Sequence, residues 1–452
     1  MKKVKRRAYS LLALIGATVI LLLIFLFRLA ADGEAWATFP SNQNVFHNGQ
    51  LSLGEVLDRN DVILAQSDGS QMHFNESTAI RRANMHVVGD RGNNIGTGIL
   101  NARAGDLIGY NLVTGTYALG GSGNSITLTI DAELSRIAYE ALAGRHGAVV
   151  VMNYETGEIL VSVSAPTYDP INMPEINFED PAWNGVFLNR VLSSSFTPGS
   201  IFKIVTAAAS LDTFADALTR TYTCRGYTII DGNRVNCTGN HGTINLTQAF
   251  GFSCNPYFAL LALDLGGPSM RQYTERFGLL SPHNVDGIRT TAGRFIAGEP
   301  GSTTLAWSGV GQSENLVNPL SFTRMMGAIP RGGTPVEPRM IEGISRGVLP
   351  SWQSRVEIGS QIMPPSVANE LAGIMRSATI NHYTGTFGIL PVAGKTGTAE
   401  VGEGRQSHSW FAGFLDDPNH PLAFTVLVEH GGGGLAAAGS VANTVLQAAI
   451  RQ

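Results

Sequence analysis

The sequence predicts an α+β fold: a single apolar helix at the N-terminus, a small β-rich module, and a larger domain whose sheet uses both ends of its chain. Three observations lead to this prediction. An uncharged stretch lies near the N-terminus, strand patterns flank a helical middle section, and the chain has no internal repeat. Strands first, helices in the middle and strands last are typical of α+β domains. A chain of 452 residues is also too long to fold around one hydrophobic core, so two or more domains are expected.

The uncharged stretch runs from Ala8 to Phe27 and is rich in Leu and Ile. A helix of this length, at about 1.5 Å per residue, spans the hydrocarbon core of a bilayer. Because six basic and no acidic residues lie in the first 28 positions, we expect a cytoplasmic tail at 1–7, a single-pass transmembrane helix at 8–27 and an extracytoplasmic remainder. The alternative is a cleaved signal peptide in which Ala35 and Ala37 form the small-x-small cleavage site, although its apolar region would be unusually long.

The chain after position 28 is acidic, with 25 basic and 35 acidic side chains, a net charge of −10 (25 − 35). Such a charge argues against nucleic-acid binding, which needs a basic surface. Hydrophobic residues make up 44% of the sequence and charged residues 15%, which is typical of a folded protein.

Residues 28–125 combine short apolar runs with Gly and Asn clusters, which favours a small strand-rich pedestal module. The Gly-rich run at 120–124 indicates a linker at its end. The larger domain then occupies residues 126–452. Near its start we expect a strand at Ser125–Ile130 and a helix capped by Asp131.

The larger domain has strand patterns near both of its ends. Gly147–Met152 and Glu158–Ser164 predict a hairpin. Roughly Thr197 to Gly267 is predicted to be helical in two stretches, separated by a loop that contains cysteines. Ser409–Phe414 and Leu422–Val428 predict strands again, so the sheet should join the two ends of this domain.

The chain has three cysteines, Cys224, Cys237 and Cys254, and three states are open for them. Outside the cytoplasm, a Cys224–Cys237 disulfide would close a short loop. The same two residues with His241 would supply three zinc ligands, but a fourth is not evident. Buried free thiols are equally compatible with the sequence.

Lysine is almost absent outside the N-terminal tail. Three of the five lysines lie within the first five positions, and the others are Lys203 and Lys395. An amine can lose its proton when it is desolvated or lies near another cation, whereas Arg stays charged. The two lysines are therefore candidates for amine chemistry, with codon bias as the alternative explanation.

Thr197 and Pro198 favour a helix start, with Thr197 as the N-cap and Ser200 in the first turn. Lys203 follows three residues later and shares a helix face with Ser200. The positive potential of a helix N-terminus lowers the pKa of a lysine and favours a nearby oxyanion. A neutral Lys203 could remove the Ser200 proton and activate the serine without a histidine.

Two later segments make this pattern specific. Ser253–Asn255 offers a hydroxyl and an amide in one short turn. Lys395–Thr398 lies on a predicted strand, where Gly397 would let a substrate backbone approach as an added strand. Lys395 with the hydroxyls of Thr396 and Thr398 could hold a carboxylate.

These segments carry a resemblance to a known family. Ser200–Lys203, Ser253–Asn255 and Lys395–Gly397 stand in the order of the three motifs of penicillin-binding proteins and serine β-lactamases. Their spacing, about 50 and then about 140 residues, is similar to that in the penicillin-binding proteins. The similar flanking segments are Gly147–Met152, Thr156–Leu160, Ser253–Phe258 and Ser409–Phe414. The resemblance covers roughly residue 126 to the C-terminus.

The layout is similar to that of the monofunctional class B transpeptidases. Only about a hundred residues separate Arg28 from the first strands of the larger domain, too few for a glycosyltransferase domain. The resemblance implies a central antiparallel sheet with helices on both faces, and no metal or cofactor. It also implies peptidoglycan stem peptides and β-lactams as ligands and a polytopic glycan polymerase as partner. The implied location is the cell membrane, with the catalytic domain outside the cytoplasm. Such enzymes attack the D-Ala-D-Ala end of a stem peptide, release D-Ala and pass the acyl group to an amine.

The resemblance further implies roles for single residues. Ser200 would be the acylated nucleophile and Lys203 its base, while Ser253 and Asn255 would relay protons and hold the substrate. The backbone N–H groups of Ser200 and Thr398 would form the oxyanion hole. The terminal carboxylate of the substrate would be bound by Lys395, Thr396, Gly397 and Thr398.

The sequence leaves two other activities and several other candidate residues open. A D,D-carboxypeptidase or β-lactamase would replace the amine acceptor by water, which the anchor-plus-pedestal layout disfavours. A β-lactam sensor would need an intracellular signalling domain, whereas seven residues precede the predicted transmembrane helix. His408 and the pair Glu429–His430 offer further bases, but we expect them to be structural residues at strand ends.

Overall fold

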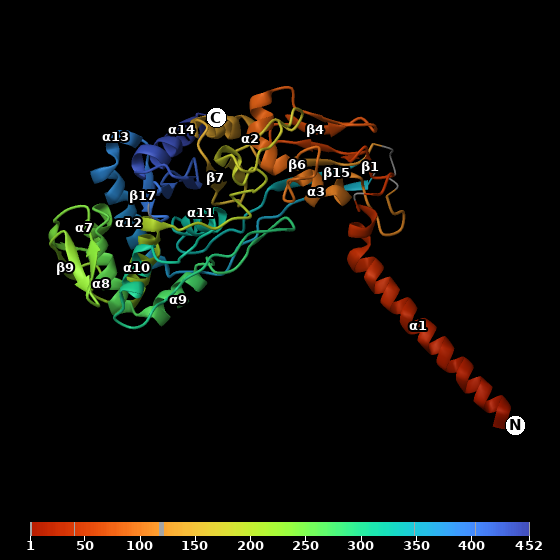
Figure 1. The fold of residues 1–452 in the computed structure, drawn as a ribbon, viewed down its shortest axis with the longest axis horizontal. Helices are drawn as coiled ribbons and strands as arrows, with labels where there is room; N and C mark the ends of the chain where they lie inside the picture. Colours follow the sequence, from red (N-terminus) through yellow and green to blue (C-terminus); the bar gives the residue numbers. More distant parts are fainter. Residues whose placement is uncertain (1, 40, 117–121, 348, 403, 452) are drawn as a thin grey trace.

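The computed structural model of the protein describes residues 2–39, 41–116, 122–347, 349–402 and 404–451. Helix α1 (Lys2–Ala37) extends as a long rod away from the rest of the protein (Figure 1). The most apolar 18-residue stretch of α1 has a mean hydropathy of 2.9, and none of it is buried. Among the described residues, it is the one helix long and apolar enough to cross a membrane. The predicted span at 8–27 lies within α1, which is longer because the first proline in the sequence is Pro40.

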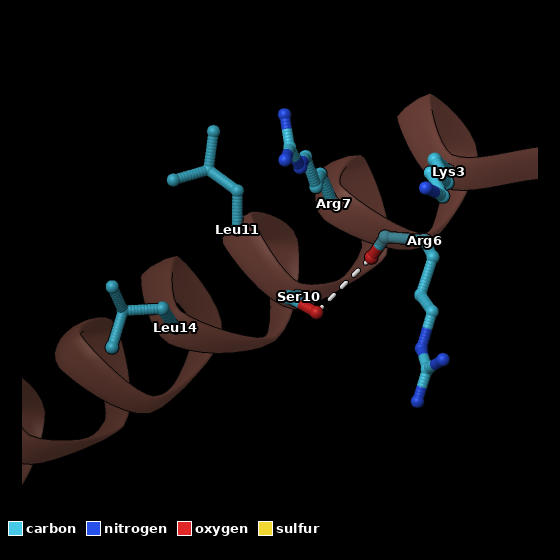
Figure 2. Close-up of a pocket in the computed structure, with 6 residues that line it drawn as sticks. All are labelled: Lys3, Arg6, Arg7, Ser10, Leu11 and Leu14. Atoms are coloured by element: carbon cyan, nitrogen blue, oxygen red, sulfur yellow. Dashed lines mark hydrogen bonds between the residues drawn. The ribbon is translucent and has the colours of Figure 1, made fainter.

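The N-terminal end of α1 carries a cluster of basic side chains. Figure 2 shows Lys3, Arg6 and Arg7 projecting from its first turns, ahead of Leu11. The hydroxyl of Ser10 donates to the carbonyl oxygen of Arg6 at 3.0 Å. Positive charge at a helix N-terminus opposes the helix dipole, so these residues do not stabilise the helix. Their position matches the basic flank that orients a membrane span.

The pedestal contains a six-stranded sheet in the order β16-β15-β6-β3-β4-β5. These strands are β3 (Glu55–Leu57), β4 (Ile63–Ser67), β5 (Met72–Phe74), β6 (Ser125–Leu128), β15 (Ile341–Arg346) and β16 (Leu349–Gln353). Residues 28–125 therefore do not contain the whole sheet of the pedestal. Strand β15, from far along the chain, pairs with β6, and β16 pairs with β15. Of the predicted Gly-rich linker, Gly120 and Gly121 lie outside the described residues.

The module also contains helices, which the prediction of a strand-rich region missed. They are α2 (Thr78–Val88), α3 (Ile99–Ala102) and α4 (Ala104–Leu107). Helix α2 packs against α5 and β8 of the larger domain. The nearly buried Arg81 on α2 binds Asp169 of the larger domain at 2.7 Å. The pedestal and the larger domain thus share both a sheet and a helix interface.

The larger domain is built on a five-stranded antiparallel sheet in the order β17-β18-β19-β7-β8. Its strands are β7 (Gly147–Asn153), β8 (Ile159–Ala165), β17 (Val392–Ala399), β18 (His408–Leu415) and β19 (Leu422–Val428). The predicted hairpin and the two predicted late strands are confirmed. Because β19 pairs with β7, the two ends of the domain meet in the middle of the sheet, as predicted.

Helices cover both faces of this sheet, as predicted, and every residue of β18 and β19 is buried. The helices of the larger domain are α5 (Ala132–Ala141), α6 (Lys203–Thr213), α7 (Leu246–Gly251), α8 (Asn255–Leu265), α9 (Gly267–Arg276), α10 (Thr303–Val310), α11 (Pro319–Ala328), α12 (Pro365–His382), α13 (Thr384–Phe387) and α14 (Ser440–Ala449), of which α5, α11, α12 and α14 pack on the sheet. Gly327 of α11 lies so close to β19 that an added Cβ would be 3.5 Å from Ala423 Cβ. On the opposite face, Phe387 of α13 stacks on Phe411 of β18 at 4.8 Å between ring centres.

Short elements complete the fold. The strand pairs are β1 (Phe46–His47) with β2 (Gln50–Leu51), β9 (Thr221–Cys224) with β12 (Gly242–Asn245), β10 (Tyr227–Ile230) with β11 (Asn233–Asn236), and β13 (Asn284–Val285) with β14 (Ile288–Arg289). Two 3-10 turns, η1 (Pro181–Trp183) and η2 (Gly199–Phe202), and one π-helical turn, η3 (Leu435–Gly439), are also present. The predicted cysteine loop between the two helical stretches consists of β9 to β12.

Candidate active site

Ser200 lies in the 3-10 turn η2, directly before α6. The predicted helix start is wrong in detail, because the turn begins at Gly199 and Thr197 does not cap it. Gly199 has a φ of 53°, and a Cβ there would overlap the carbonyl oxygen of Thr398 on β17. Only glycine satisfies both conditions. The close approach of β17 therefore shapes the turn and leaves Lys203 as the first α-helical residue.

The fully buried amine of Lys203 connects the first two sequence motifs. Its Nζ lies 3.0 Å from Ser200 Oγ, 2.7 Å from the carbonyl oxygen of Ser253, 3.1 Å from Ser253 Oγ and 2.7 Å from Asn255 Oδ1. None of these partners is a carboxylate. Burial holds the pKa of Lys203 well below its usual range, and the nearby charge of Lys395 lowers it further.

The contacts of Lys203 fit a neutral amine, which has two N–H groups and one lone pair. The carbonyl oxygen of Ser253 and Oδ1 of Asn255 can only accept, so they take the two N–H groups. The orientation of the Asn255 amide is set by its Nδ2, which donates to the carbonyl oxygen of Asn236 at 3.0 Å. The lone pair is then left for the hydroxyls of Ser200 and Ser253. This arrangement can accept a proton from Ser200 Oγ.

Ser253 is held in an uncommon backbone conformation between α7 and α8. Its φ is 54°, in the left-handed region that non-glycine residues rarely adopt. Its N–H donates to the carbonyl oxygen of Phe250 at 3.1 Å, and the next N–H, from Cys254, donates to Ala249 at 2.9 Å. Both oxygens of Ser253 lie within reach of Lys203 in this conformation. Strain of this kind is common at functional sites.

Lys395 on β17 is the second buried lysine. Its Nζ donates to the carbonyl oxygen of Thr396 at 3.0 Å, and burial lowers the pKa of Lys395 to about 7. The hydroxyl of Thr396 lies 3.1 Å from the hydroxyl of Tyr383, which burial keeps protonated by raising its pKa. Tyr383, which lies between α12 and α13, was not predicted for the site, because an isolated tyrosine gives no sequence signal.

The predicted approach of a substrate backbone at Gly397, as a strand added to β17, stays a prediction, and β17 is an edge strand of its sheet. The missing side chain of Gly397 makes room for other parts of the protein itself. A Cβ on Gly397 would lie 3.0 Å from Ile201 Cγ2 and 2.9 Å from Trp410 Cβ. Thr398, one residue later, is exposed, and its carbonyl oxygen accepts from Gln312 Nε2 at 3.4 Å. The close packing of β17 on η2 thus brings the third motif against the first.

The histidines near the third motif have structural partners, as expected. His408 is buried, accepts from the backbone N–H of His430 at 3.2 Å, and packs edge-on against Phe196. Burial lowers the pKa of His408 to about 4. Glu429 pairs with the buried Arg190. These contacts explain all three strand-end residues without catalysis.

All three cysteines are free in the structure, so the Cys224–Cys237 disulfide is not formed. Cys237 Sγ lies instead 3.9 Å from Cys254 Sγ and 3.6 Å from Nδ1 of His241. Cys254 also belongs to this group, which the sequence did not indicate because this residue occupies the middle of the second motif, far along the chain from Cys224.

The fold and the motifs match known proteins. Residues 147–450 match the family model described as the penicillin binding protein transpeptidase domain. The peptidoglycan D,D-transpeptidase PbpA of Mycolicibacterium smegmatis is 27% identical over 365 residues, 73% of each chain. The peptidoglycan D,D-transpeptidase MrdA of Acinetobacter baumannii is 27% identical over 361 residues, 70% of this chain and 52% of the relative.

Solved structures agree with the sequence relatives. The ceftriaxone acyl-enzyme complex of penicillin-binding protein A from Mycobacterium tuberculosis has a TM-score of 0.77 at 23% identity, covering 88% of this chain and 98% of that one. Penicillin-binding protein 2 of Pseudomonas aeruginosa has a TM-score of 0.71 at 26% identity, covering 88% and 96%. With the family model covering most of the chain and three motifs converging around two buried lysines, the protein belongs to the penicillin-binding protein transpeptidase family.

Proposed function

We propose that this protein is a peptidoglycan D,D-transpeptidase that works through an acyl-enzyme on Ser200 and is inactivated by β-lactams. The observation that carries the proposal is the position of Lys203 Nζ, 3.0 Å from Ser200 Oγ with its N–H groups occupied by two acceptors. Nearly all serine nucleophiles need an adjacent base, and here that base is a desolvated amine. The names of the relatives, peptidoglycan D,D-transpeptidases, agree with this chemistry.

Acylation follows from this geometry. Lys203 takes the proton of Ser200 as Oγ attacks the carbonyl carbon between the two D-Ala residues of a stem peptide. The N–H groups of Ser200 and Thr398 stabilise the oxyanion. The peptide C–N bond breaks, and the proton passes through the Ser253 hydroxyl to the amine of the departing D-Ala. Asn255 holds the lysine amine during this transfer.

The substrate carboxylate is assigned to the third motif. Lys395 on β17 supplies the positive charge, and the hydroxyls of Thr396 and Thr398 on the same strand supply hydrogen-bond donors. A protonated Lys395 is favoured when a carboxylate binds, because an opposite charge raises the pKa of a buried amine. A β-lactam carries a carboxylate and a strained amide in the same relation, so it would acylate Ser200 by the same steps.

Deacylation by an amine distinguishes a transpeptidase from a hydrolase. Among the residues that the structure describes, none of the hydrogen bonds of Ser200, Lys203, Ser253 or Asn255 goes to a carboxylate able to activate water. We therefore favour an amine acceptor over the carboxypeptidase or β-lactamase alternative. The acyl-enzyme should persist until a neighbouring stem peptide arrives.

The anchor and the partner are part of the same proposal. The exposed apolar helix α1 would hold the enzyme in the cytoplasmic membrane, with its basic end inside the cell and the pedestal outside. A polytopic glycan polymerase would then supply nascent strands at the same membrane surface. Support for this partner comes from the family resemblance, and the apolar length of α1 supports the anchor.

A labelling experiment tests the proposal. The full chain in detergent is incubated with fluorescent penicillin, and the labelled peptide is identified by mass spectrometry. We expect one adduct, on Ser200, that is absent from Ser200→Ala and persists for many minutes. With lipid-linked glycan polymer present, cross-linked muropeptides should form and penicillin should block them. Rapid penicillin hydrolysis without cross-linked product would instead support the hydrolase.

A further inference from the structure

Four potential metal ligands converge beside the second motif. The sulfur atoms of Cys224, Cys237 and Cys254 and a ring nitrogen of His241 all lie within 4.8 Å of one another. They come from the end of β9, the segment after β11, the turn between α7 and α8, and the residue before β12. Elements β9, α7 and α8 lie together at the end of the protein remote from α1 (Figure 1). Four soft ligands rarely meet in this way without a common partner.

Two separations within the cluster match those around a tetrahedral zinc ion, and all ligand atoms lie within 4.8 Å of one another. Zn–S bonds of about 2.3 Å place two tetrahedral thiolates about 3.8 Å apart, and a Zn–N bond of about 2.1 Å places nitrogen about 3.6 Å from sulfur. The structure has 3.9 Å between Cys237 and Cys254, and 3.6 Å between Cys237 Sγ and His241 Nδ1. A disulfide needs a sulfur separation of about 2.0 Å and would use only two of the four groups.

Neighbouring groups hold these ligands in place. The His241 ring stacks on Phe252 with ring centres 4.8 Å apart and planes 8° from parallel. The backbone N–H of Cys237 donates to the carbonyl oxygen of Gly226 at 2.9 Å. Cys224 and Cys254 are buried, and Cys237 and His241 are partly buried. A site closed by four protein ligands is typical of structural zinc.

We propose that Cys224, Cys237, His241 and Cys254 bind one structural zinc ion. Binding converts the three thiols to thiolates and releases their protons to solvent, while the imidazole binds in its neutral form. The four ligands complete the coordination shell, so the ion has no open position for substrate or water.

The ion would stabilise a part of the fold that has little core of its own. The two-stranded pairs β9–β12 and β10–β11 are each too small to be stable alone. A metal bound by β9, by the segment between β11 and β12 and by the α7–α8 turn ties these pairs to the helices. The free energy of metal binding then contributes directly to folding of this region.

The same ion would position the second motif. Cys254 is the residue between Ser253 and Asn255, both of which contact Lys203 Nζ. A zinc bond to Cys254 fixes the backbone at the point where Ser253 adopts a φ of 54°. The four ligands are therefore positioning residues, and loss of zinc should slow acylation through displacement of Ser253 and Asn255. The metal site itself does not depend on the proposed function; only this effect on acylation does.

Metal content is the first test. The full chain, produced without a histidine tag and purified in detergent without chelator, is analysed by inductively coupled plasma mass spectrometry. We expect about one zinc per chain. His241→Ala and Cys237→Ser should retain less than a tenth of this, whereas His47→Ala, which alters an exposed histidine of β1, should keep the full amount. Protein that carries no zinc, or loses it equally in the control, overturns the proposal.

A second measurement covers variants that fail to fold. Wild-type protein loaded with Co²⁺ should show the intense ligand-field absorption of a tetrahedral site with thiolate charge-transfer bands. Thiol titration of denatured, zinc-free wild-type protein should give three thiols. A single thiol would mean that two cysteines form a disulfide, and would overturn the metal site. After zinc removal, labelling by fluorescent penicillin should slow at least tenfold, and it should recover when zinc is added back. If the purified protein carries zinc but its removal leaves the labelling rate unchanged, the metal site stands and its positioning role is refuted.

Discussion

Replacing Lys203 by Arg keeps the positive charge and much of the length of the side chain but removes its ability to act as a base. A guanidinium stays protonated at any accessible pH, so it cannot take the Ser200 proton. General-base catalysis contributes about 10²- to 10⁴-fold, which corresponds to about 3–5 kcal/mol of activation free energy. The two acceptors now bound to the amine, the Ser253 carbonyl and Asn255 Oδ1, would meet five N–H groups in a fully buried space.

The assay is the second-order rate of labelling by fluorescent penicillin in stopped-flow or gel format. We expect Lys203→Arg and Lys203→Met to label at least 100-fold more slowly than wild type, a range set by the loss of the base. Lys395→Arg is the matched control, because holding a carboxylate needs only positive charge, and it should keep partial activity. Near-ultraviolet circular dichroism confirms folding. If folded Lys203→Arg labelled within a few-fold of wild type, the general-base role would be refuted.

Three further predictions follow from packing and burial. Gly199→Ala should lower the free energy of unfolding by at least about 2 kcal/mol more than Gly432→Ala in chemical denaturation; both positions have positive φ, but only at Gly199 does an added Cβ overlap the backbone of Thr398. Similar losses at both sites would exclude the clash. The free energy of unfolding should rise as pH increases from about 7 to 10.5. In this range Lys395 is protonated in the unfolded chain but neutral in the folded protein, where burial lowers its pKa to about 7. Lys395→Met should reduce that rise to the part contributed by Lys203, whose pKa burial also lowers, and an unchanged slope would contradict the lowered pKa of Lys395. Tyr383→Phe removes the hydroxyl 3.1 Å from its threonine partner on β17, so it should raise the KM for a stem-peptide substrate several-fold and slow penicillin labelling in the same direction, because both ligands place a carboxylate there; an unchanged KM would remove the tyrosine from the carboxylate site.

Much of the fold follows from local patterns in the sequence. Strands such as β7 and β19 are runs of apolar residues bounded by turns, and a fully buried central strand needs no other signal. The Asp131 cap was predictable because a side-chain acceptor at a helix start has few other uses, and its carboxylate accepts from Leu134 N–H at 2.7 Å. Pairings between distant segments were not predictable. Nothing in the composition of β15 indicates that it joins β6 rather than the main sheet.

The site was predictable to the extent that it depends on residue type. The two lysines that occur outside the N-terminal tail, where the chain otherwise uses Arg, were a sound signal, and both side chains are fully buried in the structure. What sequence could not provide was the use of space. Gly397 makes room for Ile201, and Cys254 faces Cys237 because the α7–α8 turn folds back on β9 to β12.

The six-stranded sheet of the pedestal also constrains the order in which the chain can fold. Strand β3 pairs with β6, but β6 lacks its other neighbour until β15 has been synthesised, on the order of tens of seconds after β3 at ribosomal rates. Strand β7 waits still longer, because its partner β19 lies near the C-terminus. Two unpaired strand edges are therefore exposed while α1 is already available to the membrane, and such edges readily pair with other chains. The N-terminal third of the chain therefore stays incomplete until nearly all of the chain has been synthesised, which makes truncation at residue 125 a poor way to isolate either part.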